Sequence, residues 1–180
     1  MMLFLATEAG GGMLSGFTSW VDSTGVATYI RENSFAFPWL EVIHIMATGL
    51  VLGVISIVDL RLLGLAATGY RTSRLMRSLL PLTWGAFAVA MLTGGLMFTS
   101  QPELYLENTA FRIKLALLLL AGLNMAVFHL WTQRGIAVWD EEGPIPVGAR
   151  LAGLISLCLW VGVVFAGRFV GFTIDAFGSF

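Results

Sequence analysis

The sequence has 180 residues, of which 57% are hydrophobic and only 12% are charged. Soluble domains carry about 25% charged residues, so this composition excludes an ordinary soluble protein and indicates an integral membrane protein in contact with the lipid bilayer. The formal net charge of −1 argues against binding to nucleic acid, which requires a concentrated basic surface. A single cysteine excludes an intramolecular disulfide.

Residues 1–37 precede the first strongly apolar stretch. Apolar residues recur there at helical spacing on both sides of Ser23 and Thr24, two residue types that cap helices. The pattern predicts a short segment of two helices lying in the membrane interface, and the alternative is an unstructured tail.

Four stretches are apolar and long enough to cross a bilayer, which takes about 20 residues. We expect these spans at about residues 38–65, 81–99, 110–132 and 149–172, followed by a C-terminal tail at 173–180. Pro38 and Pro81 are expected to open the first two spans, because the missing N–H of proline costs little at the first helical position. Each span has small residues four apart, such as Gly49 and Gly53, a spacing that lets helices approach closely. The predicted fold class is therefore all-α, a transmembrane four-helix bundle with a short interfacial helical N-terminal segment.

Basic residues set the expected orientation. The connection between the first two spans is rich in arginine, with Arg61, Arg71, Arg74 and Arg77. The connection between the second and third spans is acidic. By the positive-inside rule, the arginine-rich connection lies in the cytoplasm and both termini lie outside.

Ionisable residues within the spans are the candidate functional residues, because a charged group in hydrocarbon costs about 2.5–3.5 kcal/mol on insertion scales. His44 and His129 are the two histidines of the chain, and such a pair suggests bis-histidine ligation of haem. Counting residues from the span ends, however, separates them by roughly 20 Å along the membrane normal. The two nitrogens that ligate one haem are only about 4 Å apart. The histidines therefore belong to two separate clusters.

The first group, which we call the outer cluster, is a candidate cofactor-binding site formed by Glu41, His44, Met97, Lys114 and Arg168. Glu41 and His44 are also candidate metal ligands, because Glu-x-x-His is the spacing of carboxylate-bridged metal sites in helical bundles, although those sites need two such pairs. Four interpretations stay open: an ion-pair network, a haem b held by His44 and Met97 with its propionates on Lys114 and Arg168, a quinone or anionic ligand on the two cations, and a metal or proton pathway.

The second group, the inner cluster, is formed by Asp59, Asn124, His129 and Arg150. We expect Asp59 to form a structural ion pair with Arg61 or Arg150 at the cytoplasmic rim. His129 is expected to be a hydrogen-bonded histidine at the membrane interface.

Runs at residues 39–44, 59–64, 80–84, 93–98, 110–114, 121–124, 128–129, 149–153 and 166–168 resemble a family of bacterial inner-membrane proteins to which no activity is assigned. The resemblance implies a four-span fold and singles out the same polar residues. A fainter similarity, to copper-resistance D proteins and b-type cytochrome bundles, rests on the number of helices and the intramembrane histidines.

These features lead us to expect a non-catalytic membrane subunit that holds a ligand or redox cofactor (haem b, metal or quinone) at the outer cluster. His44 is expected to be the ligand or proton carrier, Glu41 its orienting partner, and Lys114 with Arg168 an anion clamp. The subunit is expected to work with other membrane-protein subunits or as a homo-oligomer. The alternatives are a purely structural subunit and a small proton or metal transporter that uses the polar stripe from Glu41 to Asp59.

Overall fold

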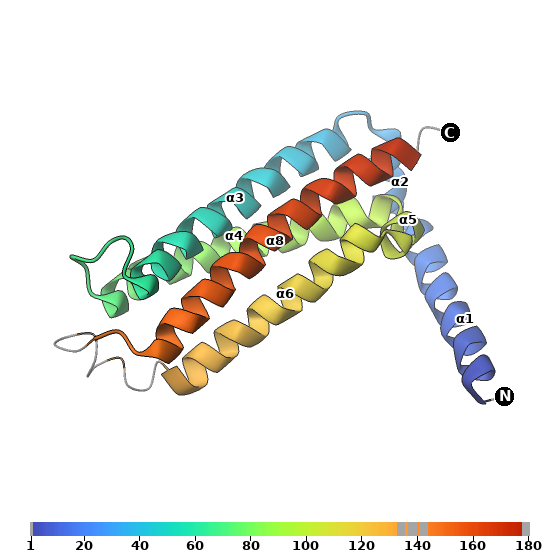
Figure 1. The fold of residues 1–180 in the computed structure, drawn as a ribbon. Helices are drawn as coiled ribbons and strands as arrows, with labels where there is room; N and C mark the ends of the chain where they lie inside the picture. Colours follow the sequence, from blue (N-terminus) through green and yellow to red (C-terminus); the bar gives the residue numbers. More distant parts are fainter. Residues whose placement is uncertain (1, 133–135, 137–139, 141–143, 178–180) are drawn as a thin grey trace.

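The computed structural model describes residues 2–132, 136, 140 and 144–177, and over these residues the chain is helical and contains no strand (Figure 1). In chain order the helices are α1 (Met2–Asp22), α2 (Gly25–Glu32), α3 (Ala36–Leu63), α4 (Thr72–Ser100), α5 (Pro102–Glu107), α6 (Thr109–Val127), the π-helix η1 (Phe128–Thr132) and α8 (Val147–Phe177). The all-α bundle predicted from the sequence is confirmed.

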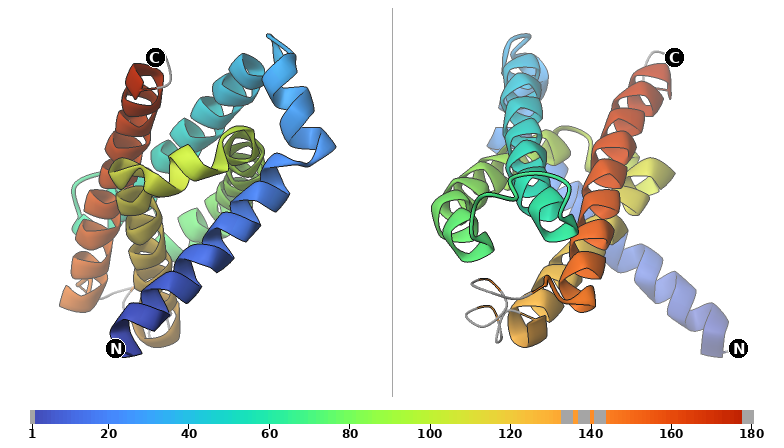
Figure 2. Two further views of the ribbon diagram at one scale, coloured as in Figure 1. Left: turned by 90° about the vertical axis from the view of Figure 1, so that its right-hand side faces the viewer. Right: turned by 60° about the vertical axis from the view of Figure 1, so that its left-hand side comes forward.

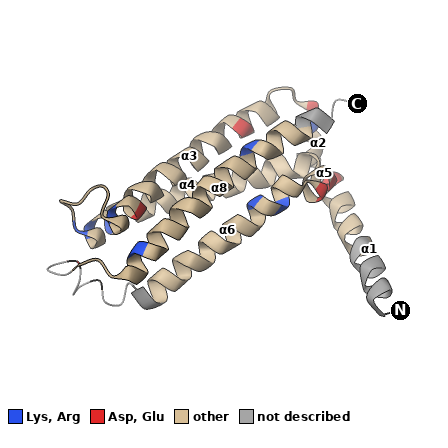
Figure 3. Ribbon diagram, in the orientation of Figure 1, with Lys and Arg blue, Asp and Glu red and all other residues tan. Residues whose placement is uncertain are grey.

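Four helices are long and apolar enough to cross a membrane. They cover Ala36–Leu63, Thr72–Ser100, Thr109–Leu130 and Val147–Ile174. Large apolar side chains on their outer faces are exposed, among them Met46, Leu92, Leu119 and Phe165. Figure 3 shows that charged residues gather toward the two ends of these helices and leave the middle uncharged. The protein is therefore a multi-pass membrane protein whose apolar surface faces lipid.

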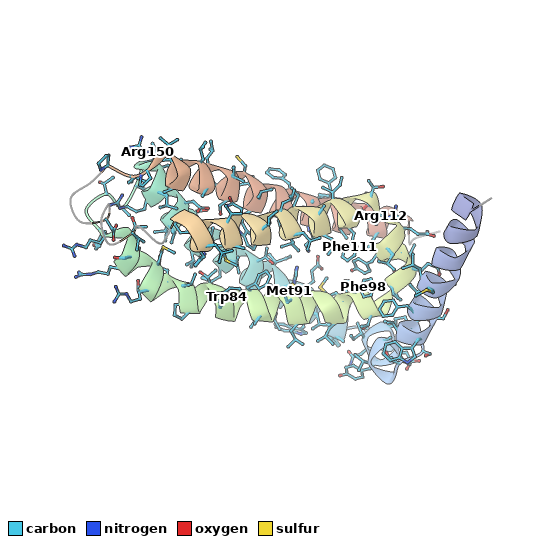
Figure 4. All side chains as sticks on the ribbon, turned by 90° about the horizontal axis from the view of Figure 1, so that it is seen from below. Trp84, Met91, Phe98, Phe111, Arg112 and Arg150 are labelled. Carbon is cyan, nitrogen blue, oxygen red and sulfur yellow. The ribbon has the colours of Figure 1, made fainter. Side chains whose placement is uncertain are left out.

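The four long helices pack as a row rather than a closed ring. α3 packs against both α4 and α8, and α8 packs against α6, whereas α4 and α6 make no contact of that extent. α4 and α6 are joined at one end by α5 and by a cluster of three aromatic rings, in which Phe98 stacks on Phe111 with ring centroids 5.9 Å apart. Tyr105 of α5 lies 6.0 and 5.3 Å from these two rings, respectively. Figure 4 shows Phe98 and Phe111 between the two helices.

The N-terminal segment forms two helices that meet at Ser23 and Thr24, where the sequence pattern places the caps. Thr24 is the N-cap of α2, and its hydroxyl accepts a hydrogen bond from the backbone N–H of Ala27 at 3.3 Å. α2 packs against α3 and α4, and Arg31 forms an ion pair with Asp22. α1 leaves the bundle at an angle (Figure 2). It is longer than the short helix predicted, because the helix continues through residues 10–12, a glycine run that favours a break.

α4 begins nine residues before the proline that was expected to open it. Pro81 lies inside the helix, and the first turn is capped instead by Asp140. The two carboxylate oxygens of Asp140 accept hydrogen bonds from the backbone N–H groups of Thr72 (2.7 Å) and Ser73 (2.9 Å). Burial acts to raise the pKa of Asp140, but these hydrogen bonds outweigh it and hold the pKa below its usual value.

A glycine of α8, and not the Gly49-x-x-x-Gly53 motif of α3, makes the close contact between α8 and α3. Gly153 of α8 lies against α3, where an added Cβ would be 3.1 Å from the Asp59 carbonyl oxygen and 3.1 Å from the Leu62 Cβ. Gly49 and Gly53, by contrast, have no neighbouring atom within 4 Å of an added Cβ. That Gly-x-x-x-Gly spacing therefore makes no close helix contact within this chain. At the C-terminus α8 runs through Phe177, beyond the span end expected at residue 172, and residues 178–180 of the expected tail lie outside the described residues.

Candidate functional site

His44 projects from α3 onto α4 and is held there by two polar atoms. Its Nδ1 lies 2.9 Å from the carbonyl oxygen of Ala90 and 3.1 Å from the hydroxyl of Thr93. Gly94 makes room for the ring, because a Cβ at this position would lie only 2.9 Å from the His44 Cε1. The close approach of α4 to α3 at this level therefore depends on a residue without a side chain.

These contacts determine which ring nitrogen carries the proton. A carbonyl oxygen can only accept, so Nδ1 of His44 must be the donor to Ala90. The Thr93 hydroxyl donates to the carbonyl of Val89 at 2.7 Å, which leaves its oxygen free to accept from Nδ1 as well. In the neutral ring Nε2 then carries the lone pair. Fixing the tautomer through a backbone carbonyl is how proteins aim the other nitrogen at a ligand.

The lone pair of His44 points at Lys114. The Nζ of Lys114, on α6, lies 3.4 Å from Nε2 and donates to it. The lysine side chain passes over α8 at Gly167, where an added Cβ would lie 3.5 Å from Nζ. The two residues, which we call the His44–Lys114 pair, thus connect all four long helices at one level.

The ammonium of Lys114 lacks a counter-charge among the described side chains. No carboxylate lies within 4.0 Å of it, and the hydrogen bond to His44 satisfies one of its three N–H donors. Arg168, also expected in this cluster, is exposed and lies over the ring of Phe172, with its guanidinium carbon 4.6 Å from the ring centroid. The ion-pair network proposed for these two cations is therefore wrong for the described residues.

The remaining members of the outer cluster, Glu41 and Met97, are half-buried, and neither side chain makes a described hydrogen bond to His44. The part of the chain that the structure describes contains no group of three or more His, Cys, Asp or Glu side chains that could hold a metal ion. A haem iron could reach Nε2 of His44 only if Lys114 moved away from it. The residues at this level therefore suit a ligand oxygen better than a metal ion.

Three members of the inner cluster line a cavity of about 160 Å³ whose wall is formed by residues of all four long helices, and which we call the Asp59 cavity. Asp59, Asn124 and His129 all contribute to its wall, whereas Arg150 is exposed and does not. The Asn124 side chain donates to the carbonyl of Ala152 at 3.0 Å. His129 lies in the π-helix η1, and its Nδ1 donates to the carbonyl of Met125 at 2.9 Å.

Asp59 is buried, with 5% of its surface exposed, and forms an ion pair with neither of the predicted partners. Arg61 instead donates to the backbone carbonyl of Tyr70 at 2.7 Å. The prediction of a structural Asp–Arg pair is therefore wrong. The common position of these residues at the cytoplasmic rim suggested the pair, but Arg61, on the last turn of α3, donates to the carbonyl of Tyr70 in the following loop.

The separation of the two histidines is confirmed. His44 contacts Lys114, and His129 follows Lys114 by 15 residues on the same helix and its π-helical extension. At 1.5 Å per residue this distance is about 22 Å, so one haem cannot bind both histidines of one chain.

Sequence reasoning did not assign the α4 side of the site, which consists of Ala90, Thr93 and Gly94. The run of small residues Ala86, Ala90 and Gly94 was interpreted only as a helix-packing face, although the same run marks the face of α4 that accepts a bulky neighbour. Comparisons of the chain with models of known protein families, with curated proteins and with solved structures found no match. The family similarity of the sequence therefore stays a resemblance, and function must be argued from the site.

Proposed function

We propose that this protein is a bacterial inner-membrane subunit that holds a lipid-soluble ligand with a carbonyl or anionic oxygen, in the first place a quinone, at the His44–Lys114 pair. The observation that carries the proposal is the 3.4 Å contact between Nζ and Nε2. The ammonium in this contact has no carboxylate within 4.0 Å among the described side chains. A partly buried cation without a counter-charge is stabilised by a ligand oxygen that accepts its free N–H groups.

The pair offers both a donor and an acceptor to such a ligand. Lys114 has N–H groups for the carbonyl oxygen of a quinone, and Nε2 of His44 can accept a hydrogen bond from the hydroxyl of a quinol. The ring cannot turn freely to change these roles, since Ala90 and Thr93 hold Nδ1. Both the quinone and the quinol form of the head group can therefore form a hydrogen bond with the His44–Lys114 pair.

The orientation proposed for the subunit places both termini outside the cell. Arg71 lies in the connection between α3 and α4, Arg74 and Arg77 follow in the first two turns of α4, and positively charged residues at such ends stay in the cytoplasm. The His44–Lys114 pair would then lie in the outer half of the membrane. We propose that the subunit works with other membrane-protein subunits or as a homo-oligomer.

A second candidate is a structural subunit without a ligand. The observation in its favour is that the His44–Lys114 pair joins α3, α4, α6 and α8 at one level. Buried polar contacts of this kind can specify how helices pair. The two candidates differ in whether a bound molecule depends on the charge of Lys114.

The test compares molecules extracted from protein purified in a mild detergent. Wild-type protein is expected to carry quinone, and Lys114→Met, which keeps the length of the side chain and removes its charge, is expected to lose most of it. Arg112→Met is the matched control, because Arg112 lies two residues away on the same helix, is exposed, and donates to the carbonyl of Leu106. His44→Ala should also reduce the quinone content.

Three results would contradict the proposal. Equal quinone content in the wild type, Lys114→Met and Arg112→Met would show that the molecule is merely carried over with lipid. A Soret band that disappears in His44→Ala would replace quinone by haem. If Lys114→Met and His44→Ala lower stability while wild-type protein carries no ligand, the structural candidate is favoured instead.

A further inference from the structure

The Asp59 cavity has properties that the His44–Lys114 pair does not explain. It lies toward the opposite end of the bundle from His44, and residues of all four long helices line it. Aromatic rings form much of its wall: Trp84, Phe87, Phe128 and Trp160. Phe87 contacts Trp84 and Trp160 edge-to-face, with ring centroids 6.0 and 6.2 Å apart, respectively. A flat apolar molecule fits such a wall.

One wall atom of this cavity has an unmet hydrogen-bonding need. The Oδ2 of Asp59 is buried and has no hydrogen-bond partner among the described residues, although the hydroxyl of Ser156 lies beside the same carboxyl group. Buried polar side-chain atoms almost always have a partner, so an isolated one marks a place where a further group is expected.

None of the described side chains donates to Oδ2 of Asp59. One of the two amide N–H groups of Asn124 is used by the carbonyl of Ala152, and Nδ1 of His129 donates to the carbonyl of Met125. Arg61 points to the carbonyl of Tyr70 and forms no ion pair with Asp59. Oδ2 therefore lies in the cavity wall without a described donor, where a bound molecule can supply one.

We propose that the Asp59 cavity binds a lipid-soluble aromatic molecule with one hydroxyl group, a phenol, whose hydroxyl pairs with Oδ2 of Asp59. A hydroxyl can donate to a carboxylate and accept from a carboxylic acid, so it suits either protonation state of Asp59. The volume of about 160 Å³ is close to that of an engineered apolar cavity of about 150 Å³ that binds benzene. The cavity therefore has room for a single ring.

The test uses two probes that differ only in the hydroxyl group, 4-bromophenol and bromobenzene. Bromine quenches tryptophan fluorescence on contact, and Trp84 and Trp160 lie in the cavity wall. Quenching is measured on the full-length protein in detergent, with a Trp84→Phe, Trp160→Phe double variant to identify the signal from the cavity. We expect 4-bromophenol to bind about fivefold more tightly than bromobenzene, the preference that one net hydrogen bond supplies.

Two variants of Asp59 separate the hydrogen bond from partitioning into the micelle. Asp59→Leu removes the polar atoms and keeps the approximate size, so the preference for the phenol should disappear. Asp59→Asn keeps an acceptor oxygen, so the preference should persist. Gly122→Leu provides a test that leaves Asp59 intact: Gly122 lines the cavity and an added Cβ there meets nothing within 4 Å, so the larger side chain should abolish quenching by both probes.

The proposal is overturned if wild-type protein binds the two probes equally, because Oδ2 is then satisfied by water or by nothing. It is also overturned if Asp59→Leu keeps the preference, or, should that variant not fold, if Gly122→Leu leaves quenching unchanged. The proposal does not rest on the quinone at the His44–Lys114 pair. Quinone content should be the same in Asp59→Leu and in the wild type, so the two proposals can fail separately.

Discussion

Replacing Gly94 by alanine should disturb the His44–Lys114 pair without removing either of its members. The new Cβ would lie 2.9 Å from Cε1 and 3.3 Å from Nδ1 of His44, distances at which the ring must move. The ring is held by the carbonyl of Ala90 and by Lys114, so any movement large enough to relieve the contact weakens both hydrogen bonds.

The size of the effect follows from three contributions. Overpacking costs about 1–3 kcal/mol, and loss of the hydrogen bond to Ala90 costs about 0.5–1.5 kcal/mol. Alanine also gains about 0.5–1 kcal/mol over glycine in a helix, a gain that Gly95→Ala shares. Gly95 adjoins Gly94 on α4, and an added Cβ there meets nothing within 4 Å. Gly94→Ala should therefore be less stable than Gly95→Ala by about 1.5–4.5 kcal/mol.

The free energy of unfolding of both variants can be measured in mixed micelles by titration with a denaturing detergent. The double variant Gly94→Ala, His44→Ala supplies the decisive comparison, because removing the ring removes the clash. Its loss of stability should be smaller than the sum of the two single losses. Equal stability of Gly94→Ala and Gly95→Ala, or strictly additive losses, would refute the placement of His44 against Gly94.

Three further substitutions test the fold. Gly153→Ala should destabilise by about 1–3 kcal/mol because its Cβ meets the backbone of α3 at 3.1 Å, whereas Gly122→Ala should not; thermal unfolding of the two variants distinguishes them. Gly64→Ala should lower the unfolding free energy by about 1 kcal/mol, since Gly64 ends α3 with φ of +77°. Asp140→Asn should cost about 0.5–1.5 kcal/mol, because the amide keeps one acceptor oxygen and loses one of the two hydrogen bonds that cap α4. Because the folded pKa of Asp140 lies below the unfolded value of about 3.9, its contribution is fully present above about pH 4 and is lost as the pH falls through the folded pKa. The stability difference between wild type and Asp140→Asn should therefore shrink on acidification, and a difference independent of pH would contradict the cap.

Much of the fold could be predicted from local patterns because a membrane span is defined within its own segment. Apolar length located all four long helices, and Ser23 and Thr24 located the break between α1 and α2. The start of α4 could not be found in this way. It depends on Asp140, a residue 68 positions away whose hydrogen bond to Thr72 no local pattern contains.

The candidate site was only partly predictable for a similar reason. Residue counting along the spans placed His44 and Lys114 at the same depth, and the structure brings them into contact. The rotation of α8 about its own axis cannot be obtained from depth, and Arg168 is found over Phe172 rather than beside His44. Asp59 was assigned an arginine partner from their common position at the cytoplasmic rim, whereas helix packing leaves its Oδ2 in the cavity wall.

The central claim, that the charge of Lys114 holds a ligand beside His44, is tested most directly by titrating a short-chain quinone into ligand-free protein. Loss of a charge-assisted hydrogen bond costs about 1.5–3 kcal/mol, so Lys114→Met should weaken binding by about 10- to 150-fold. Arg112→Met should bind like the wild type, because that side chain is exposed and donates to the carbonyl of Leu106. Equal affinities of the wild type, Lys114→Met and Arg112→Met would contradict the claim.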